Sequence, residues 1–224
     1  MHSPAPRTVL VADDHPLFRA ALRRAVAEAI EVVEVTEAVD ATTLRAAADA
    51  TPHIDLVLLD LMMPGSRSFA PLAWLRSQHA GMAVIVVSAN ESAAVMRAAL
   101  EFGAAGYVPK SAPLGDLVAA IRTVLEFGQW FPAAAFAAEP ADSPSATTAA
   151  RLASLTPQQF RVVELLALGK LNKQIAAALD ITEQTTKAHV SAALAKLGVR
   201  NRTQATLLFR SLEIQDTEPM SLER

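Results

Sequence analysis

The chain has 224 residues, more than the roughly 100 to 150 residues of one typical domain, so two domains are expected. It contains no cysteine, which excludes disulfides and thiolate chemistry and is typical of a cytoplasmic protein. No apolar run approaches the roughly 18 to 20 residues of a membrane span, and the start MHSPAPRTVL lacks the layout of a signal peptide, so no membrane contact is expected.

Charge is unevenly distributed along the chain. Residues 1–150 carry 10 Lys and Arg against 16 Asp and Glu, residues 151–212 carry 9 against 3, and the last twelve residues carry 1 against 4. An acidic first part is therefore joined to a basic second part. This asymmetry predicts that only the second part meets a polyanion.

Five short apolar runs alternate with helical patterns in the first part of the chain. They are VLVA (9–12), VVEV (32–35), DLVLL (55–59), MAVIVV (82–87) and GYVP (106–109). Several are apolar throughout, as strands of a parallel sheet covered on both faces must be. Five such strands separated by helices predict a doubly wound α/β fold with a five-stranded parallel sheet over residues 7–130.

Polar residues follow these strands at their carboxyl ends. Asp13 and Asp14 follow the first strand, Asp60 the third, Ser88 the fourth and Lys110 the fifth. Ligands of open parallel sheets bind at this edge, so we expect the five side chains to converge there. Each of them alone is more commonly a loop residue, but the whole set at successive strand ends indicates a site.

The expected set has a recognisable chemistry. Three crowded carboxylates repel one another, and a hard divalent cation such as Mg²⁺ is the usual remedy. With that metal in place, one carboxylate can attack a phosphoryl group, whose negative charge needs the metal, a Lys and a hydroxyl donor around it. Asp60, Lys110 and Ser88 fit the roles of nucleophile, cation and hydroxyl.

The segments VLVADDHP, LLDLMMPG, VVSAN and GYVPK make residues 7–130 resemble the receiver domain of a bacterial two-component response regulator. The spacings are 46 residues from Asp14 to Asp60, 28 from Asp60 to Ser88 and 22 from Ser88 to Lys110. The resemblance implies that Asp60 is the phosphoacceptor. It also implies a Mg²⁺ site formed by four residues, Asp13, Asp14, Asp60 and the backbone carbonyl of Met62.

The same resemblance assigns the remaining residues of the rim. Lys110 would pair with the phosphoryl group and Ser88 would bind it, with Tyr107 as the accompanying aromatic switch. An ordinary half-buried strand aromatic is the alternative for Tyr107. His15 is not expected to bind the metal, and Ser68 stands where the family usually has Gly, so the turn there is expected to differ.

A compositional break follows the first domain. Residues 131–150 are rich in Ala, Pro, Ser and Thr and are predicted to be a linker of mixed stiffness, with a short helical piece near residues 133–138. Residues 151–212 have a helical pattern and form the predicted second domain. Residues 213–224 are predicted to be a polar, frayed tail.

The second domain shows clear helix starts. The TPQQ sequence that begins at Thr156 offers a Thr N-cap, Pro at the first position and Gln at the third. A second helix is predicted over Asn172–Leu179, and a third, capped by Thr182, extends to residue 197.

The third helix has two contrasting faces. One is suited to a small core and carries Thr186, Val190, Ala193, Leu194 and Leu197. The other is small, polar and cationic and carries Gln184, Lys187, Ala188, Ser191 and Ala195. A short helix, a tight turn and a longer helix of this kind are typical of a helix-turn-helix that enters the major groove. A plain three-helix bundle fits the periodicity equally well.

The stretch LTPQQFRVVELLALGKLNKQIAAALDITEQTTKAHVSAALAKLGVRNRTQA resembles the LuxR-type DNA-binding domain, so the whole chain resembles a NarL/FixJ-family response regulator. By position, the residues that would face base edges are Lys187, Ala188 and Ser191. The candidates for phosphate contacts are Lys173, Thr185, Lys196, Arg200 and Arg202. The last helix, with the stripe Ala205, Leu208, Phe209 and Leu212, would close the core and help to pair two domains on DNA.

Two departures from that pattern bear on structure. Thr186 replaces the usual apolar residue, and Asp180 replaces the usual turn Gly, which is expected to strain the turn. The groove face carries few long donors, so we hypothesise that DNA shape supplies much of the specificity. Base-by-base substitution of a bound operator tests this, since losses confined to contacted positions would refute it.

The resemblance implies a transcriptional regulator that a sensor histidine kinase switches by Mg²⁺-dependent phosphorylation of Asp60. The expected partners are double-stranded DNA, RNA polymerase and a second copy of the chain on activation, and no enzymatic activity is expected beyond self-phosphorylation and dephosphorylation at Asp60. One alternative is a phosphorylation-independent regulator whose receiver serves as a dimerisation module. Another is a Mg²⁺-dependent phosphatase with an Asp nucleophile, but no acid or base follows Asp60 to serve a leaving group, because Leu61, Met62 and Met63 are apolar.

Overall fold

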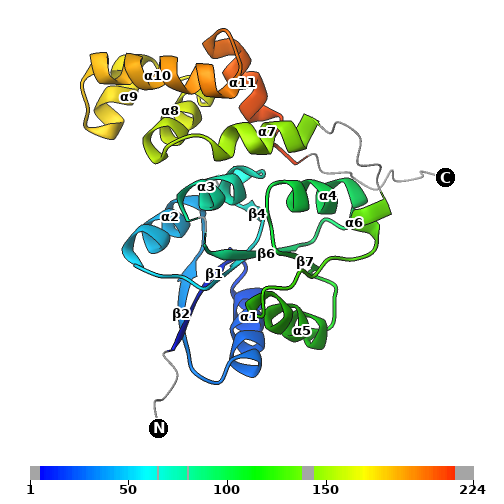
Figure 1. The fold of residues 1–224 in the computed structure, drawn as a ribbon. Helices are drawn as coiled ribbons and strands as arrows, with labels where there is room; N and C mark the ends of the chain where they lie inside the picture. The colour runs from blue at the N-terminus through cyan, green and yellow to red at the C-terminus, as the bar shows by residue number, and fades with distance from the viewer. Residues whose placement is uncertain (1–5, 65, 80, 138–143, 215–224) are drawn as a thin grey trace, which may run out of the picture.

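The computed structural model describes residues 6–64, 66–79, 81–137 and 144–214. Its first part alternates strands and helices, below a helical unit at the top of Figure 1. The elements of the first part are β1 (Arg7–Ala12), α1 (Pro16–Ala29), β2 (Val33–Ala38), α2 (Ala41–Ala50), β3 (Leu56–Leu59), β4 (Met62–Met63), β5 (Ser66–Arg67), α3 (Ala70–Gln78), β6 (Ala83–Ser88), α4 (Ala93–Glu101), β7 (Gly106–Pro109) and α5 (Leu114–Leu125).

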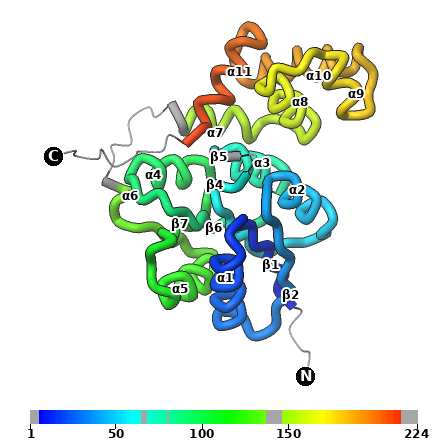
Figure 2. The backbone as a smooth tube through the Cα atoms, turned by 180° about the vertical axis from the view of Figure 1, so that it is seen from behind, coloured from blue at the N-terminus to red at the C-terminus, as the bar shows by residue number. Residues whose placement is uncertain are grey.

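The main sheet is parallel throughout, in the order β2-β1-β3-β6-β7. Its strands are buried on both faces: Val9 and Val11 pack toward α1 and α5, and Leu10 and Ala12 pack toward α2, α3 and α4. Figure 2 shows these helix layers from behind. The predicted doubly wound fold is confirmed, and the carboxyl ends of β1, β3, β6 and β7 meet at one edge of the sheet.

A short hairpin that the sequence did not indicate stands between Asp60 and α3. Met62 pairs with Arg67 and Met63 with Ser66, in antiparallel register. Met63 is fully buried, which anchors the hairpin to the core. At Ser68, the position where the turn was expected to differ, the hydroxyl accepts a hydrogen bond from the Ala70 N–H (3.2 Å), so its side chain helps to start α3.

The chain that follows α5 covers the outer edge of β7. Trp130 forms a parallel bridge with Gly106, and its carbonyl accepts a hydrogen bond from the Tyr107 N–H (2.7 Å). The Trp130 N–H in turn donates to the Ala105 carbonyl (3.1 Å). The short helix α6 (Ala134–Ala137) then packs on α4, with Ala135 fully buried. The segment after α5 is therefore held against the first domain.

The second part of the chain is helical. It consists of α7 (Pro144–Ala153), α8 (Pro157–Ala167), α9 (Asn172–Leu179), α10 (Glu183–Leu197) and α11 (Arg202–Arg210). Thr156 caps α8 in a reciprocal capping box, and Thr182 caps α10, as expected. The helix α7 begins inside the stretch predicted as linker, of which residues 138–143 lie outside the described part. The helix α11 ends at Arg210, so Leu212 lies beyond the helix whose stripe it was expected to join.

The two departures in this part have local explanations. Thr186 is fully buried, and its hydroxyl donates to the Thr182 carbonyl (3.1 Å), so the buried hydroxyl of Thr186 has a hydrogen-bond partner. Asp180 ends α9 in the left-handed conformation, at φ 52°. Asp tolerates this conformation better than most residues, but Gly adopts it without steric cost.

We expect Asp180→Gly to raise the free energy of unfolding by about 0.5 to 1 kcal/mol, because it relieves this backbone strain. Thermal denaturation of the full chain measures the change. The matched control is Gly198→Ala at the end of α10, which should destabilise the chain, since Gly198 has φ 64° and an added Cβ would lie 3.3 Å from Arg151 Cζ. A lower melting temperature for Asp180→Gly would show that the relieved strain is smaller than the conformational entropy that Gly adds to the unfolded chain.

Candidate functional site

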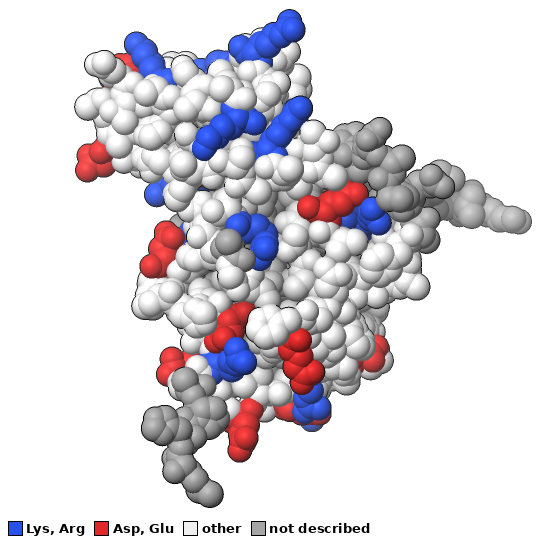
Figure 3. Space-filling model, viewed as in Figure 1, with Lys and Arg blue, Asp and Glu red and all other residues white. Residues whose placement is uncertain are grey.

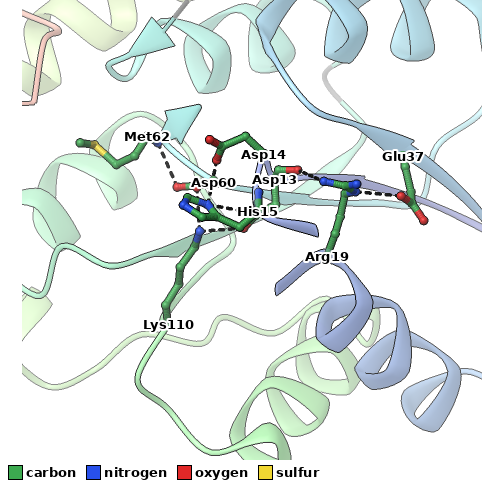
Figure 4. A network of polar contacts seen from close by, with 8 residues as sticks. All are labelled: Asp13, Asp14, His15, Arg19, Glu37, Asp60, Met62 and Lys110. Atoms are coloured by element: carbon green, nitrogen blue, oxygen red, sulfur yellow. Dashed lines mark hydrogen bonds and ion pairs between the residues drawn. The ribbon is translucent and has the colours of Figure 1, made fainter. Parts of the chain in front are cut away.

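Three carboxylates and one ammonium group meet at the carboxyl edge of the sheet (Figure 4). Asp13 and Asp60 are buried, and the side chain of Asp14 is 26% exposed. Lys110 Nζ lies 2.7 Å from Asp13 Oδ2 and 2.7 Å from Asp60 Oδ2. The structure thus brings together Asp13, Asp14, Asp60 and Lys110, which lie at the ends of three separate strands.

Backbone groups fix the two buried carboxylates. The His15 N–H donates to Asp13 Oδ1 (2.8 Å), and the Met62 N–H donates to Asp60 Oδ1 (2.9 Å). The hairpin therefore places its first residue, Met62, directly against the Asp60 side chain. Each carboxylate keeps one oxygen toward Lys110, so the Lys110 ammonium links β1 to β3.

A further contact supports the acidic loop from behind and was not expected from sequence. Arg19, on α1, donates to the Asp13 carbonyl (2.9 Å) and to Glu37 Oε2 (2.8 Å). The hydrogen bond from Arg19, together with that from Arg23, lowers the pKa of Glu37, although partial burial by itself would raise it. Glu37 therefore stays ionised and holds the Arg19 guanidinium under the loop (Figure 4). Only the tertiary structure pairs these residues, which are 18 positions apart.

The charge balance of the site favours a cation. Burial by itself would lower the pKa of Lys110, but hydrogen bonds to Asp13 and Asp60 outweigh it, so the pKa is raised and the ammonium is retained. One ammonium does not neutralise three carboxylates. Negative charge therefore remains at the rim when all three are ionised.

The donor atoms fit a hard divalent metal ion. Asp13, Asp14, His15 and Asp60 offer ligand atoms that all lie within 4.8 Å of one another. Asp13 Oδ2 and Asp14 Oδ1 are buried, with Lys110 Nζ 2.7 Å from the first and His15 Nδ1 2.9 Å from the second. Each carboxylate oxygen has a further lone pair that a cation at the rim can use. Carboxylate oxygens are the ligands that Mg²⁺ prefers in proteins.

Ser88 and Tyr107 lie on the neighbouring strands β6 and β7. Both are fully buried, so Tyr107 lies deeper than the half-buried strand aromatic of the alternative prediction. The Ser88 hydroxyl accepts from the Asn90 N–H (3.2 Å), and the Tyr107 hydroxyl donates to the Asn90 carbonyl. Burial raises the pKa of Tyr107 to about 12, so this hydroxyl keeps its proton. Both side chains thus hold the loop that follows β6.

A second candidate site lies on α10. The face predicted for the major groove is exposed at all five positions, Gln184, Lys187, Ala188, Ser191 and Ala195. The opposite face is buried at Thr186, Ala193 and Leu197. In Figure 1 α10 lies on the side of the helical unit that points away from the sheet, and Figure 3 shows Lys and Arg side chains over this unit. An exposed helix face with one lysine, on a helical unit that carries further Lys and Arg side chains, is therefore available for a polyanion.

The five candidates for phosphate contacts fall into two groups. Lys173, Thr185 and Arg200 are exposed. Lys196 is exposed too, but its Nζ donates to the Ser154 carbonyl (2.8 Å) and to Gln159 Oε1 (2.9 Å), and Arg202 Nη2 donates to the Lys170 carbonyl (2.9 Å). The charged ends of Lys196 and Arg202 therefore hold helices together, a role that periodicity does not reveal.

Two families match the chain in separate segments. Residues 9–122 match the response regulator receiver domain, and residues 153–209 match the bacterial regulatory proteins of the luxR family. Among the helices that the structure describes, none is long and apolar enough to cross a membrane.

Relatives match over nearly the full length. The glycerol metabolism activator of Pseudomonas putida is 38% identical over 205 residues, which cover 89% of this chain and 93% of that protein. The nitrate/nitrite response regulator protein NarL of Escherichia coli strain K12 is 33% identical over 211 residues, covering 92% and 96%. A solved structure of RcsB from Salmonella enterica serovar Typhimurium, bound to promoter rprA in the presence of the phosphomimetic BeF3⁻, matches with a TM-score of 0.51 and 26% identity over 92% of this chain and 98% of that one.

Proposed function

Because this chain belongs to the NarL/FixJ-type response regulators, with a receiver domain and a LuxR-type DNA-binding domain, we propose that Mg²⁺-dependent phosphorylation of Asp60 controls its binding to DNA. The observation that carries the proposal is the Lys110 ammonium, which lies 2.7 Å from the Asp60 carboxylate in a buried acidic site. The donor is a phosphohistidine of a sensor histidine kinase. RNA polymerase is the further partner at the promoter.

Each residue of the rim has a defined part in phosphoryl transfer. Asp60 Oδ2 attacks phosphorus, the donor P–N bond breaks, and a carboxyl phosphate forms. Met62 N–H holds the other oxygen of Asp60, and Lys110 pairs with the incoming phosphoryl oxygens. Mg²⁺, held by Asp13, Asp14, Asp60 and the Met62 carbonyl, would neutralise charge on the phosphoryl group when bound.

Ser88 and Tyr107 supply the switch in this proposal. A phosphoryl group on Asp60 draws the Ser88 hydroxyl toward it and away from the Asn90 N–H. The Tyr107 hydroxyl, which donates to the Asn90 carbonyl, then holds the same loop in its new position. The loop leads into α4, so the charge change shifts the population toward the form that dimerises on DNA.

DNA binding before and after phosphorylation tests this function. The probe is a fluorescent duplex selected from random sequence with the phosphorylated chain. We expect Mg²⁺ and a small acyl phosphate to strengthen binding and expect EDTA to prevent the gain. Equal affinity with and without the donor would favour the phosphorylation-independent regulator. Continuous turnover of a phosphomonoester would favour the phosphatase.

We expect Asp14→Asn to weaken Mg²⁺ binding by about tenfold or more, because it removes one of the three anionic groups around the metal. Calorimetric titration of the full chain with MgCl₂ measures the affinity. Asp116→Asn, at an exposed carboxylate on α5, is the matched control and should leave the affinity unchanged. Equal affinities for both variants would place the metal elsewhere.

A further inference from the structure

The DNA-binding domain rests on the receiver through an apolar contact. In Figures 1 and 2, α7 lies across α3 and α4. Leu152 of α7 and Leu212 after α11 are almost fully buried, in the same continuous core as Phe69 and Trp74 of the receiver. The two domains therefore share one hydrophobic cluster.

An ion pair stands beside this apolar contact. Arg45 on α2 and Glu164 on α8 meet in a two-point arrangement, with Nη1 to Oε2 at 2.5 Å and Nη2 to Oε1 at 2.6 Å. Both side chains are less than one-quarter exposed. The Arg45 guanidinium also lies over the Trp74 ring, 5.4 Å from its centroid. Geometry of this kind fixes orientation as well as proximity.

Backbone pairing closes the same interface. The Phe69 N–H donates to the Leu212 carbonyl (3.0 Å), and Ser68 forms an antiparallel bridge with Glu213. Ile214 is 8% exposed, so the start of the predicted polar tail is packed at this place. Residues 215–224 of that tail lie outside the described part.

Part of the receiver side of this contact, at Ser68 and Phe69, lies shortly after Asp60 in the chain. The hairpin β4–β5 begins two residues after Asp60 and leads through Ser68 and Phe69 into α3. The Met62 N–H at its start holds Asp60 Oδ1. A change at Asp60 therefore has a short covalent path to the domain contact. The exposed face of α10 lies on the other side of the DNA-binding domain.

We propose that these contacts form a latch, consisting of Arg45, Glu164, Phe69 and Leu212, by which the receiver sets the orientation of the DNA-binding domain without covering its recognition helix. The hairpin after Asp60 connects the latch to the phosphorylation site, and this connection rests on the proposed function. The receiver then governs how two recognition helices are spaced on two half-sites. Access of one helix to DNA is unaffected.

Charge reversal tests the latch in the full chain. Because the chain has no cysteine, Glu34→Cys and Thr203→Cys provide one dye on each domain for energy transfer. Arg45→Glu and Glu164→Arg should each lower the transfer, and the double variant should restore it. Arg24→Glu, an exposed change on α1, is the control. Unchanged transfer in both single variants, or no recovery in the double variant, would overturn the latch.

DNA-binding affinity distinguishes a receiver that only orients the DNA-binding domain from a receiver that covers the recognition helix. The probe is a random-sequence duplex of about one helical turn at low salt, long enough for one domain only. We expect Arg45→Glu and the charge-balanced double variant to bind this duplex with affinities within about twofold of each other. A tenfold difference would correspond to about 1.4 kcal/mol. A gain of about tenfold on breaking the ion pair would show that the receiver covers the recognition helix.

The proposed connection between Asp60 and the latch is tested by energy transfer in the same dye-labelled protein. We expect an acyl phosphate with Mg²⁺ to change the energy transfer in step with the phosphoryl adduct seen by intact mass. An adduct without any change in transfer would refute the link and leave the proposed function standing. Absence of an adduct would refute the proposed function, and the charge-reversal result would still decide the latch.

Discussion

Asp60→Ala is expected to abolish the single phosphoryl adduct that forms on the full chain in Mg²⁺ and a small acyl phosphate. The proposed function makes Asp60 the nucleophile: its Oδ1 is held by the Met62 N–H, and its Oδ2 lies beside Lys110. Asp13 has comparable contacts, with the His15 N–H and with Lys110, so it is the first alternative acceptor to consider. Intact-mass spectrometry measures the adduct.

The variant should remain folded, which keeps this result interpretable. Lys110 retains Asp13 as a partner at 2.7 Å, and removal of one of three like charges relieves repulsion. Thermal denaturation checks the fold. Asp116→Ala, on the surface of α5, is the matched control and should accept the phosphoryl group as the wild type does. An adduct that persists in Asp60→Ala would identify a different acceptor.

Lys187→Ala is expected to weaken binding of the phosphorylated chain to its selected duplex by about 5- to 150-fold, the range for loss of one base contact. Lys187 is the only Lys or Arg on the exposed face of α10 described above. Fluorescence anisotropy at a fixed salt concentration measures the affinity. A Lys187→Ala chain that binds as tightly as the wild type would remove α10 from the groove.

Two further lysines serve as comparisons for that result. Lys173→Ala should weaken binding to every sequence to a similar extent and lower the salt dependence, because a phosphate contact carries no sequence information. Lys196→Ala should lower the melting temperature instead, since its ammonium bonds to Ser154 and Gln159 inside the domain. If Lys196→Ala weakened DNA binding as Lys187→Ala does and left the melting temperature unchanged, the internal hydrogen bonds would not be the main role of Lys196.

The parts that could be predicted from sequence are those with local signals. The five strands of the main sheet were predicted because strands buried on both faces are apolar throughout. The bounds of α9 and α10 were predicted because caps and turns stand at their ends. The convergence of the acidic residues followed from the rule that parallel strands present their carboxyl ends to one edge.

The parts that were missed depend on tertiary contacts. The hairpin β4–β5 has two residues per strand, too few for any periodicity. Residues 144–150 of α7 were assigned to a linker because their composition is small and polar, but Ala149 within them is buried in the core that the receiver shares. Arg45 and Glu164 are 119 positions apart, so no local pattern joins them. Leu212 was placed on a helix stripe because it follows Phe209 at helical spacing. Its backbone partner, Phe69, lies in the other domain, so no local pattern reveals that contact.

The attachment of Trp130 and α6 to the receiver shortens the tether between the domains. Only six residues separate Ala137 from Pro144, so a released DNA-binding domain stays within about 25 Å of its attachment point. A tether this short gives each domain an effective concentration in the millimolar range at the surface of the other. An interface too weak to join two separate proteins therefore suffices within one chain. The contact between the two domains therefore needs no tight affinity, and a small change in free energy is enough to break or re-form it.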